Sequence, residues 1–151
     1  MAKEAQQDVL EGRLRQAQLK VTAPRVAVLG VLSGRGHLDA DTVFSAIAAE
    51  LPKTSLQAVY GVLAALVTAG LVRKIEPAAS PALYEARVGD NHHHLVCRNC
   101  KNVADVDCVV GESPCLTPSD LNGFAVQEAE VTFWGICAPC QAAIATAAAT
   151  A

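Results

Sequence analysis

Two C-x₂-C pairs constrain the fold of this chain more than any other feature. Cys97 and Cys100 form the first pair, and Cys137 and Cys140 form the second after a gap of 36 residues. A C-x₂-C turn presents two thiolates to one ion, and zinc takes four such ligands in a tetrahedron. The pairs therefore predict a closed, structural zinc site that clamps the intervening strands. Unlinked free cysteines are the alternative reading.

A run of histidines directly before the first pair indicates a second kind of metal site. His92, His93 and His94 precede Leu95-Val96-Cys97. If this run is a strand, His92 and His94 point to one face and His93 points to the other. Imidazole and carboxylate ligands suit Fe²⁺, Mn²⁺ or Zn²⁺. Spacing alone supports only His92 and His94 as ligands of such a site.

Length and cysteine usage set the class of protein. The chain has 151 residues, which is enough for one ordinary domain or two small ones. The polar start of the sequence lacks the apolar core of a signal peptide, and no apolar run is long enough for a transmembrane helix. We therefore expect a cytoplasmic protein, in which six cysteines indicate metal or redox chemistry.

Charge is divided unevenly along the chain, whose net charge is −3. Residues 1–87 carry ten Lys or Arg and eight Asp or Glu, whereas residues 88–151 carry two and seven. A slightly basic first half suits nucleic acid, and an acidic second half suits a different role, so we expect two domains. Chance is the alternative explanation with numbers this small.

The first half is predicted to be a winged helix-turn-helix. Apolar residues recur at helical spacing over residues 6–18, 24–34, 39–50 and 55–70, with Asp39 and Ser55 as expected N-caps. Residues 71–75 and 82–86 then predict a hairpin. Helices followed by a hairpin is the order of a winged helix, in which the helix after Ser55 enters the major groove.

The second half is predicted to be a small α/β domain. Short strands are expected at residues 93–97, 102–107 and 125–134, with a short helix near residues 118–121 and a helical tail from Gln141. The fold class is therefore α+β. We expect the winged helix over residues 1–86, a hinge at residues 87–91 and a metal-binding domain over residues 92–151. Cys108 and Cys115 stand outside both pairs and are interpreted as buried fillers, a redox pair or extra metal ligands.

The helix expected over residues 56–70 contains no Lys or Arg. Its outer face offers Gln57, which can read adenine, and Ala58, whose methyl can contact thymine. Phosphate contacts would then come from basic residues elsewhere, and a solvated helix face of other purpose is the alternative. The predicted DNA-binding residues are Arg13, Arg15, Lys20, Thr22, Arg25, Gln57, Tyr60, Arg73 and Lys74.

These motifs together resemble the ferric uptake regulator family, and the match runs in order along nearly the whole chain. Its sequence is most similar to the actinobacterial FurA/CatR branch, whose members regulate catalase or catalase-peroxidase genes. The matching stretches are Leu19–Arg25, Gly36–Ala40, Ala58–Leu63, Ala69–Val72, His92–Cys100 and Gly135–Cys140. One departure is Gly61, which stands where the family has an arginine.

The resemblance implies a homodimeric, metal-dependent repressor of double-stranded operator DNA, with an N-terminal winged helix and a C-terminal dimerisation domain. It implies structural Zn²⁺ on Cys97, Cys100, Cys137 and Cys140. It also implies a regulatory Fe²⁺ or Mn²⁺ site. The residues that match this regulatory site are His37, Glu85, His92, His94 and Asp105.

Asp105 bears on what is sensed, because peroxide-sensing members resemble this chain in having aspartate where iron-sensing members tend to have glutamate. The resemblance therefore favours a repressor that responds to peroxide through oxidation of a metal-ligating histidine. An iron-uptake or zinc-uptake repressor without peroxide sensing is the alternative within the family. A metal-dependent enzyme is the alternative from another class, and we do not expect one.

Overall fold

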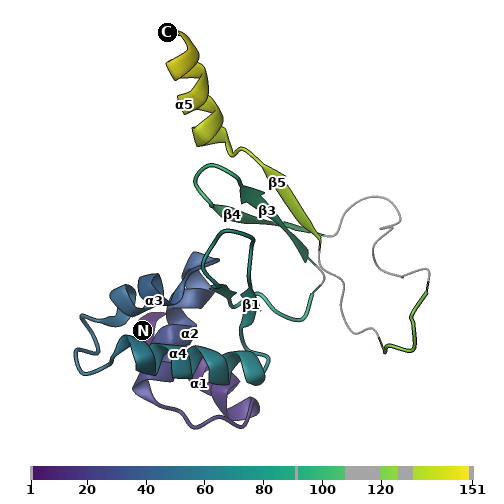
Figure 1. The fold of residues 1–151 in the computed structure, drawn as a ribbon. Coiled ribbons are helices and arrows are strands. Elements are labelled where there is room, and N and C mark those ends of the chain that lie inside the picture. Colours follow the sequence, from purple (N-terminus) through teal and green to yellow (C-terminus); the bar gives the residue numbers. More distant parts are fainter. Residues whose placement is uncertain (1, 91, 108–119, 126–130, 150–151) are drawn as a thin grey trace. The chain divides into compact units, whose positions relative to one another are not determined.

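The computed structural model describes residues 2–90, 92–107, 120–125 and 131–149. It divides into two compact units, one ending at Asp90 and the other beginning at Asn91 (Figure 1). We call them unit 1 and unit 2 and describe each by itself. Helices occupy most of unit 1 and a sheet organises unit 2, so the α+β class is confirmed. No helix in the described part of the chain combines the length and apolar character needed to cross a membrane.

Unit 1 begins with four helices: α1 (Ala2–Gln16), α2 (Ala23–Arg35), α3 (Ala40–Ile47) and α4 (Leu56–Thr68). Both expected caps form, since Asp39 Oδ1 accepts from the Thr42 N–H at 2.7 Å and Ser55 Oγ accepts from the Ala58 N–H at 3.2 Å. Gly36 follows α2 with a φ of 73°, a backbone conformation that favours glycine. Local sequence signals therefore set the ends of α2, α3 and α4.

The helices pack around one apolar core. Its members come from the inner faces of all four helices, and many have no exposed surface. Burial of each aliphatic side chain contributes about 1.5–3 kcal/mol, so the core is the main source of stability for unit 1. The fully enclosed members include Leu14, Val28, Leu29, Val43, Val59, Leu63 and Leu66.

A two-stranded wing completes unit 1. Strands β1 (Arg73–Ile75) and β2 (Leu83–Glu85) pair antiparallel, with Arg73 opposite Glu85 and Lys74 opposite Tyr84. Leu38, in the loop between α2 and α3, forms a bridge to Tyr84 through two backbone hydrogen bonds of 3.0 and 2.8 Å. This bridge ties the loop after α2 to the wing.

Unit 2 is built on a three-stranded sheet. Strands β3 (His92–Cys97), β4 (Val103–Asp107) and β5 (Thr132–Gly135) lie in the order β4-β3-β5, and α5 (Ala138–Ala149) follows. β3 pairs antiparallel with β4 and parallel with β5. β5 is shorter than the strand expected at residues 125–134, part of which lies outside the described residues. Part of the helix expected near residues 118–121 also lies outside the described residues. Residues 121–124 form a turn.

Candidate metal centres and nucleic-acid interface

The two C-x₂-C pairs meet at one end of the unit 2 sheet. Cys97 ends β3, and Cys137 and Cys140 stand just before and within the first turn of α5. Their three Sγ atoms and that of Cys100 all lie within 4.8 Å of one another. Zn–S bonds of about 2.3 Å place tetrahedral sulfur ligands about 3.8 Å apart. The four thiols therefore fit a single zinc ion.

The thiols in this group perturb one another. The backbone N–H groups of Cys100 and Cys137 lower the pKa of Cys97 to about 6, and the Cys137 N–H lies 3.4 Å from the Cys97 Sγ. The backbone N–H of Cys140 lowers the pKa of Cys137. Hydrogen bonds with the neighbouring thiols, together with burial, outweigh that effect and raise the pKa of Cys137 to about 12. Four thiolates this close together would repel one another, and a cation among them compensates their charge.

Arg98 links the first C-x₂-C turn to the sheet. Its backbone N–H donates to the Gly135 carbonyl at 2.8 Å, and its guanidinium lies 5.4 Å from the centre of the Trp134 ring. A cation over an indole face is attracted by the ring quadrupole. The only tryptophan of the chain therefore packs against the turn that carries Cys97 and Cys100.

A second group of ligand-type side chains lies on one face of the same sheet. His94 stands directly opposite Asp105, and the two imidazoles of His92 and His94 lie 5.0 Å apart between ring centres. The Asp105 Oδ1 is 3.9 Å from the His92 Nε2 and 3.8 Å from the His94 Nε2. Two atoms that bind one ion at about 2.1 Å lie about 3–4 Å apart. Three of the five predicted ligands therefore lie together within unit 2, at separations that fit one ion.

The neighbouring residues of this sheet add two observations. Side-chain alternation turns His93 to the opposite face, where its ring contacts Phe133 at 6.3 Å between centres. Asp107 stands directly opposite His92 and shares the face of Asp105. The sequence analysis did not single out Asp107. The signal was available, because Asp105-x-Asp107 repeats the two-residue spacing of His92-x-His94.

The remaining two predicted ligands come together in unit 1. His37 follows the Gly36 turn after α2, and Glu85 ends β2. The His37 Nε2 lies 3.1 Å from the Glu85 Oε2, and both side chains are at most 5% exposed. The bridge between Leu38 and Tyr84 explains the meeting, because these are the chain neighbours of His37 and Glu85. Unit 1 therefore holds a preformed imidazole and carboxylate pair.

The basic residues predicted to contact DNA are mostly engaged within unit 1. Arg25 donates to the Lys20 carbonyl at 2.9 Å, Arg15 pairs with Glu11 at 2.6 Å, and Arg13 donates to Ser33 at 3.3 Å. Such surface contacts are weak and do not prevent a phosphate contact. Lys74 likewise pairs with Glu76 at 2.8 Å on the wing.

Four other predicted DNA-binding residues lie on the surface, and Arg73 of the wing is half-buried. Lys20 and Thr22 are exposed, and the Thr22 side chain makes no capping hydrogen bond at the start of α2. Gln57 and Tyr60 are exposed on α4, whose buried face carries Val59, Leu63 and Leu66. The exposed face of α4 is uncharged, as the sequence predicted.

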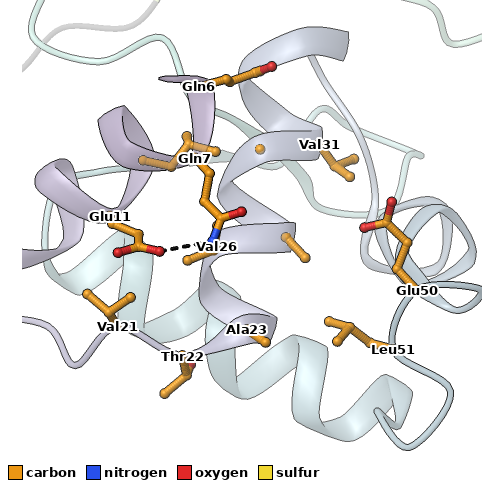
Figure 2. Close-up of a pocket in the computed structure, with 13 residues that line it drawn as sticks. Gln6, Gln7, Glu11, Val21, Thr22, Ala23, Val26, Val31, Glu50 and Leu51 are labelled. Atoms are coloured by element: carbon orange, nitrogen blue, oxygen red, sulfur yellow. Dashed lines mark hydrogen bonds between the residues drawn. The ribbon is translucent and has the colours of Figure 1, made fainter. Parts of the chain in front are cut away.

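A groove in unit 1, which Thr22 also lines, differs in character. It has a volume of about 520 Å³ and is lined by α1, α2 and the residues that follow α3 (Figure 2). Leu10, Val26 and Val31 give it an apolar lining, and the charged side chains among its described lining residues are Glu11 and Glu50. These carboxylates repel phosphate. None of the predicted metal ligands lines this groove.

A winged helix joined to a sheet that carries clustered cysteines and histidines defines a metal-responsive regulator of DNA. Comparison with known proteins agrees, since the ferric uptake regulator family matches residues 16–133. The chain belongs to this family of metal-dependent transcriptional regulators.

The relatives are similar over most of their length. Transcriptional regulator FurA of Mycobacterium tuberculosis (strain ATCC 25618 / H37Rv) is 60% identical over 128 residues, which cover 85% of this chain and 87% of that protein. Ferric uptake regulation protein 1 of Mycolicibacterium fortuitum is 54% identical over 123 residues, covering 82% and 76%. A solved structure, the ferric uptake regulator from Pseudomonas aeruginosa with manganese, is 25% identical with a TM-score of 0.63, covering 86% of this chain and 98% of that one.

Proposed function

We propose that the chain is a homodimeric repressor whose affinity for operator DNA depends on a regulatory Fe²⁺ or Mn²⁺ ion. Structural Zn²⁺ is held by the four clustered thiols of unit 2 and stabilises that unit for dimerisation. The winged helix of unit 1 contacts the operator with α4 and with the basic residues around it. The ligands of the regulatory ion are His37 and Glu85 from unit 1 with His92, His94 and Asp105 from unit 2.

The observation that carries this proposal is the division of the ligands between the two units. Each unit by itself brings predicted ligands close together, with atom separations of 3.1 Å in unit 1 and 3.8–3.9 Å in unit 2. An ion that takes ligands from both parts binds one arrangement of the units more tightly than the others. It therefore shifts the population toward that arrangement, and residues 87–91 are the proposed hinge.

We further propose that the signal is peroxide and that the regulated genes encode catalase or catalase-peroxidase. Support comes from the aspartate at position 105 and from the similarity to FurA at 60% identity. A bound Fe²⁺ would supply the redox chemistry that activates peroxide close to its imidazole ligands. The balanced change on the chain is insertion of one oxygen into a ring C–H bond of histidine, while peroxide is reduced to water. The oxidised ring is a poor ligand, so His37, His92 or His94 would no longer hold the units together.

Mass spectrometry after peroxide treatment tests this proposal. With Fe²⁺ we expect release from a catalase-type promoter fragment together with a gain of about 16 Da, one oxygen, on a peptide that contains His37 or His92–His94. Mn²⁺ is a weaker reductant toward peroxide, so the gain should be absent. Asp105→Glu should reduce the oxidation while metal-dependent DNA binding persists. Release with either metal, with oxygen or disulfides only on cysteines, would instead support a thiol switch at Cys108 and Cys115, which lie outside the described residues.

An iron-uptake repressor is the second candidate, because ferric uptake regulation protein 1 of Mycolicibacterium fortuitum is 54% identical. In that case Fe²⁺ and Mn²⁺ would both promote DNA binding and peroxide would leave it unchanged. The curated relatives are named as regulators, so an enzymatic function has no support among them.

A further inference from the structure

The register of the wing places a basic residue across from a candidate metal ligand. Arg73 of β1 stands directly opposite Glu85 of β2, whereas its neighbour Lys74 stands opposite Tyr84. In an antiparallel pair, directly opposite side chains leave the same face with their Cβ atoms about 4.5–5.5 Å apart. A predicted phosphate contact and a predicted metal ligand therefore share one face of the wing.

The surroundings of Glu85 require a compensating charge. The residue is 1% exposed, and a buried carboxylate is costly unless cations or hydrogen-bond donors surround it. His37 provides one polar partner, with its Nε2 at 3.1 Å. In the wing, the cation directly across from Glu85 is Arg73, which is half-buried. Lys74, by contrast, is exposed and pairs with Glu76 at 2.8 Å.

A divalent ion on Glu85 changes this balance. The ion supplies the positive charge that the carboxylate needs, and a guanidinium on the same face is then repelled by it. An arginine has a long stem and can turn its planar head to another anion. Because Arg73 is half-buried, part of its side chain still reaches solvent, and the anion that a DNA-binding wing meets there is a backbone phosphate.

We propose that Arg73 reports the metal state of Glu85 to DNA: the carboxylate holds the guanidinium in the metal-free chain and releases it to a phosphate when an ion binds. This inference rests on the proposed function, because it takes Glu85 as a ligand of the regulatory ion. It adds a residue whose contribution to DNA binding depends on metal, next to Lys74, whose contribution does not.

The test measures the salt dependence of DNA binding with and without Mn²⁺, an ion chosen because it reacts slowly with peroxide. The duplex is one selected from a random pool by the Mn²⁺-loaded wild-type protein. Each neutralised phosphate contributes about −0.9 to the slope of log K against log salt concentration. For the wild type we expect a steeper slope with Mn²⁺ than without, by about 0.9 for each Arg73 that reaches a phosphate.

Two substitutions separate the neighbours. Arg73→Gln should abolish the difference between the two slopes, and Arg73→Lys should restore part of it because the charge returns. Lys74→Gln is the matched control on the same strand, and it should flatten both slopes equally. Thermal melting of each variant confirms that unit 1 is folded.

A third substitution gives a readout without any metal. Glu85→Gln removes the charge that holds Arg73, so its metal-free slope should approach that of the Mn²⁺-loaded wild type. In the metal-free state Arg73→Gln should lower the melting temperature, because it removes a charge that compensates the Glu85 carboxylate, while Lys74→Gln should not.

The outcomes distinguish the two proposals. If wild-type DNA affinity does not respond to Mn²⁺, the proposed function fails. If it responds but Arg73→Gln and Lys74→Gln flatten both slopes alike, Arg73 is a constant contact and the inference about Arg73 is overturned. The same conclusion follows if Glu85→Gln leaves the metal-free slope unchanged.

Discussion

Replacement of Cys97 by serine should unfold unit 2 and leave unit 1 intact. The reason lies in how apolar burial is distributed. Among the described residues, fifteen buried hydrophobic side chains belong to unit 1 and three, Val96, Cys97 and Cys140, belong to unit 2. Burial of a side chain such as Val96 contributes about 1.5–3 kcal/mol, whereas a structural zinc ion contributes about 10–16 kcal/mol. The described core of unit 2 is too small to replace the ion.

The assay can follow the two units separately. Trp134 is the single tryptophan and packs against Arg98 beside the thiols, so its fluorescence reports on unit 2. Far-ultraviolet circular dichroism reports mainly on the helices of unit 1. In Cys97→Ser, and in the wild type after chelation of the zinc, we expect red-shifted tryptophan emission at ambient temperature. The circular dichroism signal of the helices should still show cooperative unfolding on heating.

Cys115→Ser provides the control, because Cys115 belongs to neither C-x₂-C pair. It should retain one zinc per chain and the wild-type emission. A Cys97→Ser protein that lacks zinc and still shows native tryptophan emission and a dimeric mass would refute the reasoning.

Three further predictions concern unit 1. Asp39→Ala removes the bond to the Thr42 N–H at 2.7 Å and should lower the free energy of unfolding by about 1 kcal/mol in urea titrations, and Asp39→Asn should recover most of it. Gly61→Ala should raise the free energy of unfolding by about 0.5–1 kcal/mol, because alanine favours the helix and nothing lies within 4 Å of a Cβ added at this helical position. Burial raises the pKa of Tyr84 above 10.0. Tyr84 therefore contributes fully to stability at pH values below the pKa that it has in the unfolded chain. This contribution is lost as the pH rises through the pKa of Tyr84 in the folded chain, so Tyr84→Phe should remove that part of the loss of stability at alkaline pH.

The helices and the cysteine cluster could be predicted from the sequence because their signals are local. Asp39 and Ser55 cap helices where expected, and the C-x₂-C spacing identifies thiols that prove to be clustered. Helix α1 begins at Ala2, before the first apolar position at Val9, because Ala, Glu and Gln favour helix without forming an apolar stripe. Periodicity alone therefore underestimated its length.

The proposed regulatory ligands could be predicted from residue spacing only in part, because those that come together within unit 1 are far apart in the sequence. Strand alternation placed His92 and His94 on one face, but His37, Glu85 and Asp105 were assigned through a family resemblance. The bridge between Leu38 and Tyr84 brings His37 to Glu85 across 47 intervening residues, and no spacing rule encodes it. The same holds for the register that sets Arg73 against Glu85, which depends on the turn geometry of the wing.

The parallel pairing of β3 with β5 has a consequence for how the chain folds. Parallel strands cannot be joined by a tight turn, so this pairing waits for a long segment to close, whereas the helices of unit 1 form through near-neighbour contacts. Unit 1 should therefore fold early, and β3 should spend longer with one edge uncovered. An uncovered edge is a template for intermolecular pairing. Zinc, by fixing Cys137 beside Cys97, would shorten that interval, so zinc-starved chains should be lost to aggregation before they could act as a metal-free repressor.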